Sequence, residues 1–247
     1  MKVLRYPDPL AASQACGERI MDLLAEAIAA RKLATLAVSG GTSPRPMFEL
    51  FAKRSFLWAQ VHIFWVDERR VPPSDPQSNY RLANETWLGP AKVPEGNIHR
   101  VLTEQEPHEA ARQYAEQIRA VFQAFFGLKA GELPRFDVIH RGVGPDAHTA
   151  SLFPGESLIE DHTRLAAAVW VEKMRQWRVT LLPGVLEAAR NTVMLVTGSD
   201  KAQALDAVLR GGYDPVKLPA QIAAREATWF LDEAAAILLK DLPIEPA

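Results

Sequence analysis

The segment at residues 136–155 reads FDVIHRGVGPDAHTASLFPG, a buried-strand pattern that breaks at a Gly-x-Gly turn. The apolar residues at 136–139 predict a strand, and the glycines predict its carboxyl end. Asp146 and His148 follow at once. Ligands of open parallel sheets bind just beyond the carboxyl ends of the strands, so His148 is a candidate general base. Taken alone, the segment is equally consistent with a strand-to-helix turn that carries a solvated histidine.

Outward from this segment, strand and helix patterns alternate along the chain. Alternation of this kind predicts parallel βαβ units. We therefore expect an α/β fold of three layers, with a Rossmann-like, mostly parallel sheet of six or seven strands and helices on both faces. Residues 1–247 are predicted to form a single domain. Strands are expected at 33–38, 61–66, 136–139, 165–171, 177–182, 192–198 and 227–232. Helices are expected at 9–32, 44–53, 80–88 and 107–126. Three more helices are expected: one that begins at Pro183, one that Ser199 or Asp200 caps and that ends at Leu209, and an Ala-rich one after Asp232.

Composition excludes several classes of protein. Of 247 residues 48% are hydrophobic, which is typical of a globular core, and the net charge of −2 gives no electrostatic footprint for nucleic acid. The single cysteine, Cys16, allows no internal disulfide framework. No stretch reaches the roughly 18 apolar residues of a membrane span, and the first residues do not resemble a signal peptide. We expect a cytoplasmic protein without membrane or nucleic-acid partners.

A second glycine turn follows the strand predicted at 33–38. Here glycines let the backbone approach a ligand closely, and exposed amides at a helix start attract an anion. Hydroxyl groups add hydrogen-bond donors, so phosphate is the ligand we expect at this turn. Ser43 is expected to cap the helix that begins at Pro44, and a plain capped turn is the alternative. The turn comprises Ser39, Gly40, Gly41, Thr42 and Ser43.

Charged residues stand at the ends of other predicted strands. Asp67 and Arg69 end the strand at 61–66, where an arginine can grip a phosphate or carboxylate and an aspartate can hold sugar hydroxyls. Arg178 begins a strand, and Lys201 lies in a first helical turn, where a cation opposes the helix dipole. Solvated surface charge is the competing interpretation for each.

The remaining histidines give no metal site. His62 lies within a strand pattern and is expected to be structural, whereas His99, His108 and His162 are expected in loops or on the surface. No His or Cys pair has metal-ligand spacing, so we predict no metal.

Six motifs in order resemble the 6-phosphogluconolactonase family, which belongs with glucosamine-6-phosphate deaminase and is similar in fold to ribose-5-phosphate isomerase. The matching motifs span nearly the whole chain. They are SGGTSP at 39–44, WVDER at 65–69 with SNYR at 78–81, GVGPDAHTASLFPG at 142–155, RVT at 178–180, VTGSDKA at 196–202 and LPAQ at 218–221 leading to Trp229.

The resemblance implies hydrolysis of 6-phospho-D-glucono-1,5-lactone to 6-phosphogluconate without metal or cofactor. We also expect a monomer or small homo-oligomer. The resemblance makes His148 the catalytic histidine. It implies substrate binding by residues 39–43, Asp67, Arg69, Asn79, Gly144, Arg178 and Lys201.

The chain departs from the family pattern at five places. Ala147 stands where the family often has Gly, which matters only if its φ is positive. His140 and Arg141 replace the usual apolar residues and are expected either to pair at the cleft wall or to perturb it. Leu182 and Glu187 stand near positions where the family has Thr or Ser and Asn, which leaves local substrate contacts open.

In the expected mechanism, neutral His148 takes a proton from water as the water attacks C1, and later returns it to the ring oxygen. Asp146 is expected to orient the imidazole. Backbone amides near 142–144 or Arg69 would stabilise the oxyanion. Two other functions remain: an amino-sugar-phosphate isomerase or deaminase, and a non-catalytic sugar-phosphate-binding module. Regulators of the second kind carry a DNA-binding helix pair, for which the chain has no spare length.

Overall fold

The computed structural model describes residues 1–239 and 245–246. Its strands are β1 Lys2–Tyr6, β2 Ala34–Val38, β3 Val61–Trp65, β4 Asp67–Arg69, β5 Ile98–His99, β6 Val138–Arg141, β7 Ala166–Val171, β8 Gln176–Leu181, β9 Thr192–Val196, β10 Thr228–Asp232 and β11 Glu245–Pro246. Its α-helices are α1 Pro9–Arg31, α2 Arg45–Lys53, α3 Asn79–Ala83, α4 Pro107–Phe126, α5 Pro183–Ala188 and α6 Ala202–Arg210.

Eight strands form the main sheet in the order β11-β1-β10-β9-β6-β2-β3-β5, and every described neighbour pair is parallel. From β2 the chain proceeds outward to β3, while from its neighbour β6 it proceeds the other way to β9. The order of connection therefore reverses between β2 and β6. A crevice opens at the carboxyl ends of the strands at such a point, and both glycine turns lead into it.

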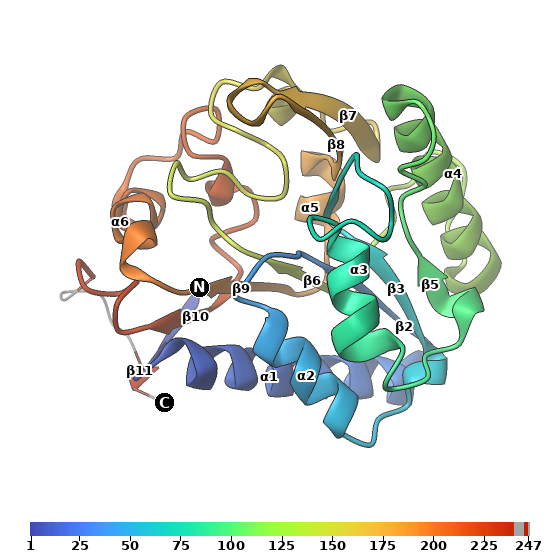
Figure 1. Ribbon diagram of the computed structural model, residues 1–247, viewed down its shortest axis with the longest axis horizontal. Coiled ribbons are helices and arrows are strands. Elements are labelled where there is room, and N and C mark those ends of the chain that lie inside the picture. The colour runs from blue at the N-terminus through green and yellow to red at the C-terminus, as the bar shows by residue number, and fades with distance from the viewer. Residues whose placement is uncertain (240–244, 247) are drawn as a thin grey trace.

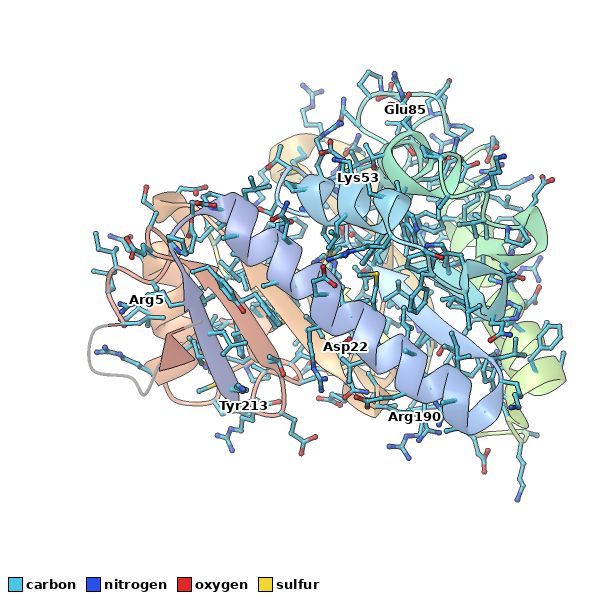
Figure 2. All side chains as sticks on the ribbon, turned by 90° about the horizontal axis from the view of Figure 1, so that it is seen from below. Arg5, Asp22, Lys53, Glu85, Arg190 and Tyr213 are labelled. Carbon is cyan, nitrogen blue, oxygen red and sulfur yellow. The ribbon has the colours of Figure 1, made fainter. Side chains whose placement is uncertain are left out.

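Helices cover both faces of the sheet because its strands are apolar on both sides. In β3, Ile63 and Trp65 pack in the core beneath α1 and α2, whereas Phe64 packs in the core beneath α4 and α5. A third apolar cluster joins β9 and β10 to α6. Figure 1 shows α1 and α2 along one side of the sheet and α4, α5 and α6 on the other. Seen from below in Figure 2, α1 lies over the strands with the exposed Asp22 near its middle. These layers confirm the predicted fold class.

A second, smaller sheet lies beyond the carboxyl edge of the main one, near the top of Figure 1. Its strands are antiparallel, in the order β4-β8-β7. The strands expected at 165–171 and 177–182 thus exist, but they form a hairpin outside the main sheet. Only a short turn joins them, and a parallel pair needs a crossover of a dozen residues or more.

Several local expectations are corrected. Strand β1 was not anticipated. The helix predicted at 44–53 begins at Arg45, and its cap residue Pro44 offers no side-chain hydrogen bond, so Ser43 is not the cap. The helix expected at 80–88 consists of α3 and a π-helical turn, Asn84–Leu88. After β10, residues 233–238 form turns instead of an Ala-rich helix, since Asp232 binds the amide of Ala235 and that alanine packs into the α6 cluster.

Candidate active site

A pocket of about 430 Å³ lies at the carboxyl edge of the main sheet, where β2 and β6 diverge. Most of the predicted site residues line it: Ser39, Gly40, Gly41, Thr42, Ser43, Asp67, Arg69, Gly144, His148, Arg178 and Lys201. Asp146 and Asn79 do not line the pocket but stand behind residues that do. The structure therefore brings residues from five separate segments of the sequence together around one cavity.

His148 is held by Asp146 in a defined orientation. The imidazole Nδ1 lies 2.5 Å from Asp146 Oδ1, and the His148 side chain is 20% exposed. An ionised carboxylate can only accept a hydrogen bond, so Nδ1 carries the proton and Nε2 keeps its lone pair. The ring also packs against Phe153, with centroids 4.3 Å apart. This tautomer is the one that a general base requires.

Burial by itself would raise the pKa of the Asp146 carboxyl, but hydrogen bonds from His148 and Lys173 outweigh that effect and hold the pKa below its ordinary value. Asp146 is therefore a carboxylate throughout the neutral range. The predicted role of Asp146, orientation of the imidazole, agrees with this arrangement.

The backbone of this loop closes tightly around the histidine. The Gly144 amide donates to the carbonyl of His148, 2.9 Å away, and a Cβ added at Gly144 would come within 2.0 Å of the imidazole ring. Ala147 has a φ of 65°, so the family's usual Gly at this position has a physical reason and the alanine is strained. The carbonyl of Ala147 accepts a hydrogen bond from the amide of Ala220, which ties the loop to the turn Pro219–Gln221.

The loop at residues 39–43 faces the histidine from the end of β2. Gly41 has a φ of 101°, and a Cβ on Gly40 would lie 1.9 Å from Asn79 Oδ1. Both glycines are thus required, one by the turn and one by the close approach of Asn79. Ser43 and Thr197 join their hydroxyls at 2.8 Å, which links this loop to the one after β9.

Successive side chains of β4 point to opposite faces of the small sheet, so Glu68 lies on the other face from Asp67 and Arg69. Glu68 points away from the pocket and accepts hydrogen bonds from the amides of Arg69, Asn79 and Tyr80, which fixes the start of α3. Burial raises the pKa of the Glu68 carboxyl against these hydrogen bonds. Asp67 and Arg69 therefore share the opposite side of the strand and line the pocket.

Asn79 supports Asp67 from behind. Its amide nitrogen donates to the Asp67 carbonyl at 2.8 Å, and the residue is 1% exposed. We predicted that Asn79 contacts substrate, whereas the structure places it beneath Gly40 and outside the lining of the pocket. Its position fits a role in holding the loop and Asp67 in register.

Two arginines stand side by side on the small sheet. Arg69 of β4 is directly opposite Arg178 of β8, and like charges in that position repel. Ser151 donates to Asp67 at 2.7 Å and accepts from Arg178 at 3.4 Å, while Asp67 and Arg178 lie 3.8 Å apart. Burial lowers the pKa of Arg178, and Asp67 opposes that effect. Two neighbouring cations of this kind, Arg178 buried and Arg69 half-buried, suit an anionic ligand.

Lys201 approaches the pocket from the loop after β9. It lies in the single turn Ser199–Lys201 and pairs with Asp200, and both residues line the cavity. Neither Ser199 nor Asp200 caps α6 by a side-chain hydrogen bond. The loop is instead anchored by Asp232, whose carboxylate accepts a hydrogen bond from the amide of Gly198 at 3.0 Å.

His140 and Arg141 point to opposite sides of β6 and do not pair with each other. His140 lines the pocket, and its Nδ1 accepts from the amide of Ser39 at 3.4 Å. Burial lowers the pKa of His140 to about 3, so it is neutral. Arg141 is fully buried, donates to the carbonyl of Ile222 at 2.5 Å and has a pKa lowered by burial to about 10.

The other departures from the family pattern lie outside the pocket. Leu182 is fully buried at the start of α5, and Glu187 binds His162 Nδ1 at 2.9 Å. His99 was expected in a loop or on the surface, which is wrong. It is buried in β5, and its Nε2 lies 2.9 Å from Nδ1 of His62. The prediction failed because a strand as short as β5 carries no sequence pattern.

Sequence reasoning did not identify Lys173 and Met174, although both lie at the site. They occupy the turn Glu172–Met174 at the tip of the β7–β8 hairpin. Lys173 pairs with Asp146, and the sulfur of Met174 lies 2.6 Å from a guanidinium nitrogen of Arg178. No local pattern marks this tip as functional, because its contacts are made only when the hairpin folds over the main sheet.

Within residues 1–239 and 245–246, no cluster of three or more metal-ligating side chains occurs. In the same described part of the chain, no helix has the length and apolarity that crossing a membrane requires.

Comparisons with known proteins agree with this geometry. Residues 7–231 match the family model described as glucosamine-6-phosphate isomerases/6-phosphogluconolactonase. A 6-phosphogluconolactonase of Synechocystis sp. is 37% identical over 215 residues, which are 86% of this chain and 87% of that protein. One of Nostoc sp. is 34% identical over 232 residues, covering 93% and 94% of the two chains.

A solved structure is similar as well. The crystal structure of a 6-phosphogluconolactonase from Thermotoga maritima superposes with a TM-score of 0.80 at 27% identity, covering 94% of this chain and 99% of the other.

Proposed function

The chain belongs to the family of glucosamine-6-phosphate isomerases and 6-phosphogluconolactonases, and we propose that His148 activates the water that opens its substrate. It is an enzyme with 6-phosphogluconolactonase activity, a hydrolase of the pentose phosphate pathway that acts on a phosphosugar lactone. The observation that carries the mechanism is the hydrogen bond from His148 Nδ1 to Asp146, because it leaves Nε2 ready to take a proton.

The reaction proceeds in two proton transfers. Water attacks C1 of the lactone while Nε2 of His148 removes one of its protons, which gives a tetrahedral oxyanion and an imidazolium stabilised by Asp146. The oxyanion then collapses, the bond from C1 to the ring oxygen breaks, and the imidazolium gives its proton to that oxygen. The open-chain acid that results loses its carboxyl proton to solvent to give 6-phosphogluconate, and the histidine returns to its neutral state.

Arg69 is the donor that best suits the oxyanion. The amide of Gly144, one of the donors considered from the sequence, is already bonded to the carbonyl of His148. Arg69 lines the same pocket and is anchored through Nη1 to the carbonyl of Gln77 at 2.7 Å. A fixed cation beside the reacting carbonyl stabilises charge as it develops in the transition state.

The phosphate group fits the opposite end of the pocket. There the amides and hydroxyls of residues 39–43 meet Thr197 and the ammonium of Lys201. Asp67 and Arg178, fixed through Ser151, are then placed to bind the sugar hydroxyls between the phosphate and C1. Binding energy from the phosphate positions C1 near His148.

The experiment that tests this function measures freshly prepared 6-phosphogluconolactone in an assay coupled to 6-phosphogluconate dehydrogenase. We expect the protein to raise the rate well above spontaneous hydrolysis, without added metal and with no loss in the presence of chelator. Release of ammonia from glucosamine 6-phosphate, without acceleration of the lactone reaction, would instead assign the chain to the isomerase and deaminase branch. Tight binding of both sugar phosphates without turnover would indicate a binding module.

Two further expectations from the sequence stay predictions: location in the cytoplasm, and a monomer or small homo-oligomer. One relative, 33% identical over 208 residues, is a chloroplastic 6-phosphogluconolactonase of Arabidopsis thaliana.

A further inference from the structure

The tip of the β7–β8 hairpin reaches across to the loop that carries His148. The tip is the turn Glu172–Met174, and Arg175 closes it with a φ of 47°. Antiparallel pairing between β7 and β8 extends up to Val171 and Gln176, so the turn projects from a rigid ladder. Lys173 therefore comes from a segment 27 residues away from Asp146 in the sequence.

Lys173 and His148 divide the two oxygens of one carboxylate between them. His148 Nδ1 binds Oδ1 of Asp146, and the Lys173 ammonium binds Oδ2. The same ammonium lies 4.3 Å above the ring of Phe153, and that ring packs against the imidazole. Lys173 does not line the pocket, so its contacts are with the groups that hold the histidine.

We propose that Lys173 is a positioning residue for the lactonase reaction. Its ammonium fixes Asp146 with one oxygen aimed at His148, and it compensates the carboxylate charge that would otherwise favour a protonated, inactive imidazole. The proposal rests on the proposed function, in which His148 is the general base.

The sign of the effect follows from the charges that face the dyad. Asp146 attracts a proton onto His148, whereas Lys173 on the hairpin opposes it. The other charged groups at the pocket are Asp67 and Arg69 on β4, Arg178 on β8, and Asp200 with Lys201 after β9. Asp67 and Asp200 are matched by Arg178 and Lys201 as ion-pair partners, so the ammonium of Lys173 is the local counter-charge of Asp146. Its removal leaves the Asp146 carboxylate without that counter-charge, so activity should be lost at a higher pH on the acid side.

The test is the pH profile of lactone hydrolysis between pH 5 and pH 8 for wild type, Lys173→Met and Lys173→Arg. Lys173 is 48% exposed in its side chain, so the methionine variant should fold. We expect the midpoint of the acid limb to move up by about one pH unit in Lys173→Met. Its kcat should fall several-fold below pH 7 with KM nearly unchanged, and Lys173→Arg should restore most of the wild-type profile.

A charge-matched control and a double mutant separate this role from a general electrostatic or structural one. Lys129→Met removes one exposed lysine beyond the end of α4, far from the pocket, and should leave the profile unchanged. In an Asp146→Asn background, Lys173→Met should have no further effect. A Lys173→Met profile that superposes on wild type, or an equal effect with and without Asp146, would overturn the inference. Wild-type rates in His148→Ala would overturn the proposed function instead.

Discussion

Charged clusters stand at the two opposite edges of the main sheet, and they differ in how far their charges are satisfied. At the amino edge, Asp137 is 3% exposed and its Oδ2 accepts from both the amide and the hydroxyl of Thr35. Its Oδ1 binds Arg31 and lies 3.4 Å from Arg190. Every oxygen of this carboxylate is occupied, and the cluster joins the end of α1 to β2 and β6.

At the carboxyl edge the cations outnumber their partners. Arg69, Arg178 and Lys201 line the pocket with only Asp67 and Asp200 as acidic companions among the described residues that form its wall. The Nε atoms of Arg69 and Arg178 are buried without a hydrogen-bond partner. A buried donor without a partner is costly, so we expect an anionic ligand to complete this edge. A cluster whose charges are all paired therefore stabilises the fold, whereas one with unpaired cations is available to bind a ligand.

The largest expected effect is on catalysis at the open edge. His148→Ala should lower kcat about a thousandfold, because general-base catalysis contributes roughly 10²–10⁴ in rate. His162→Ala is the matched control, since His162 also bonds a carboxylate but lies outside the pocket. Coupled assays on fresh lactone measure both variants. A His148→Ala protein that folds and retains its rate would remove the histidine from the mechanism.

At the closed edge the effect should fall on stability. Asp137→Asn leaves Arg31 and Arg190, which are 39% and 42% exposed, without their common carboxylate, and loss of the hydrogen bonds to this buried carboxylate costs about 2 kcal/mol. We expect the free energy of unfolding in urea to drop by that amount while kcat/KM stays at the wild-type value. A selective loss of activity at unchanged stability would break the comparison between the two edges.

Arg178→Met should give the reverse pattern with a smaller magnitude. The Nη1 atom of Arg178 lies as far as 3.8 Å from Asp67, and Asp67 keeps its hydrogen bond from Ser151 at 2.7 Å, so loss of the guanidinium should cost little stability. We expect kcat/KM to fall about thirtyfold, equivalent to about 2 kcal/mol, through loss of sugar contacts and of the link to Asp67. Urea unfolding should stay within about 1 kcal/mol of wild type, and a collapse in stability with normal turnover would contradict this assignment.

The buried pair His62–His99 lies outside the pocket, and we expect it to affect the pH dependence of stability. Burial and the neighbouring His62 lower the pKa of His99 to about 4, whereas the unfolded chain has its ordinary pKa of about 6.5. As pH falls from 6.5 to 4 the unfolded state binds the proton first, so stability should decrease by up to about 1.4 kcal/mol per pH unit. Chemical unfolding at several pH values measures this slope, and His99→Phe should flatten it. An identical slope in the variant would place the titrating group elsewhere.

Local sequence patterns predicted both glycine turns, the parallel core strands and most of the pocket wall. These features depend on neighbours in the sequence: a run such as residues 34–38 followed by glycines is visible without any tertiary contact. The positive φ of Ala147 was foreseen as the condition under which that residue would matter.

Long-range features escaped prediction for a physical reason. Strand β4 has three residues, too few for a pattern, and its pairing with β8 spans about half the chain. The same pairing decides that Asp67 and Arg69 face the pocket while Glu68 turns away. The ion pair of Lys173 with Asp146 forms only because the β7–β8 hairpin folds over the main sheet, so no local pattern predicts it. The burial of His99 likewise depends on its contact with His62 of β3.

We propose that the open carboxyl edge, and not the closed amino edge, binds the phosphosugar. The most direct test is a titration of isotope-labelled His148→Ala protein with 6-phosphogluconate, followed by the NMR signals of glycine amides. Gly40, Gly41 and Gly144 line the pocket, whereas Gly127 lies in the cavity beside Arg31 and Asp137. We expect saturable shifts of the first three signals and none for Gly127. Shifts confined to Gly127, or no saturable shift at all, would contradict the proposal.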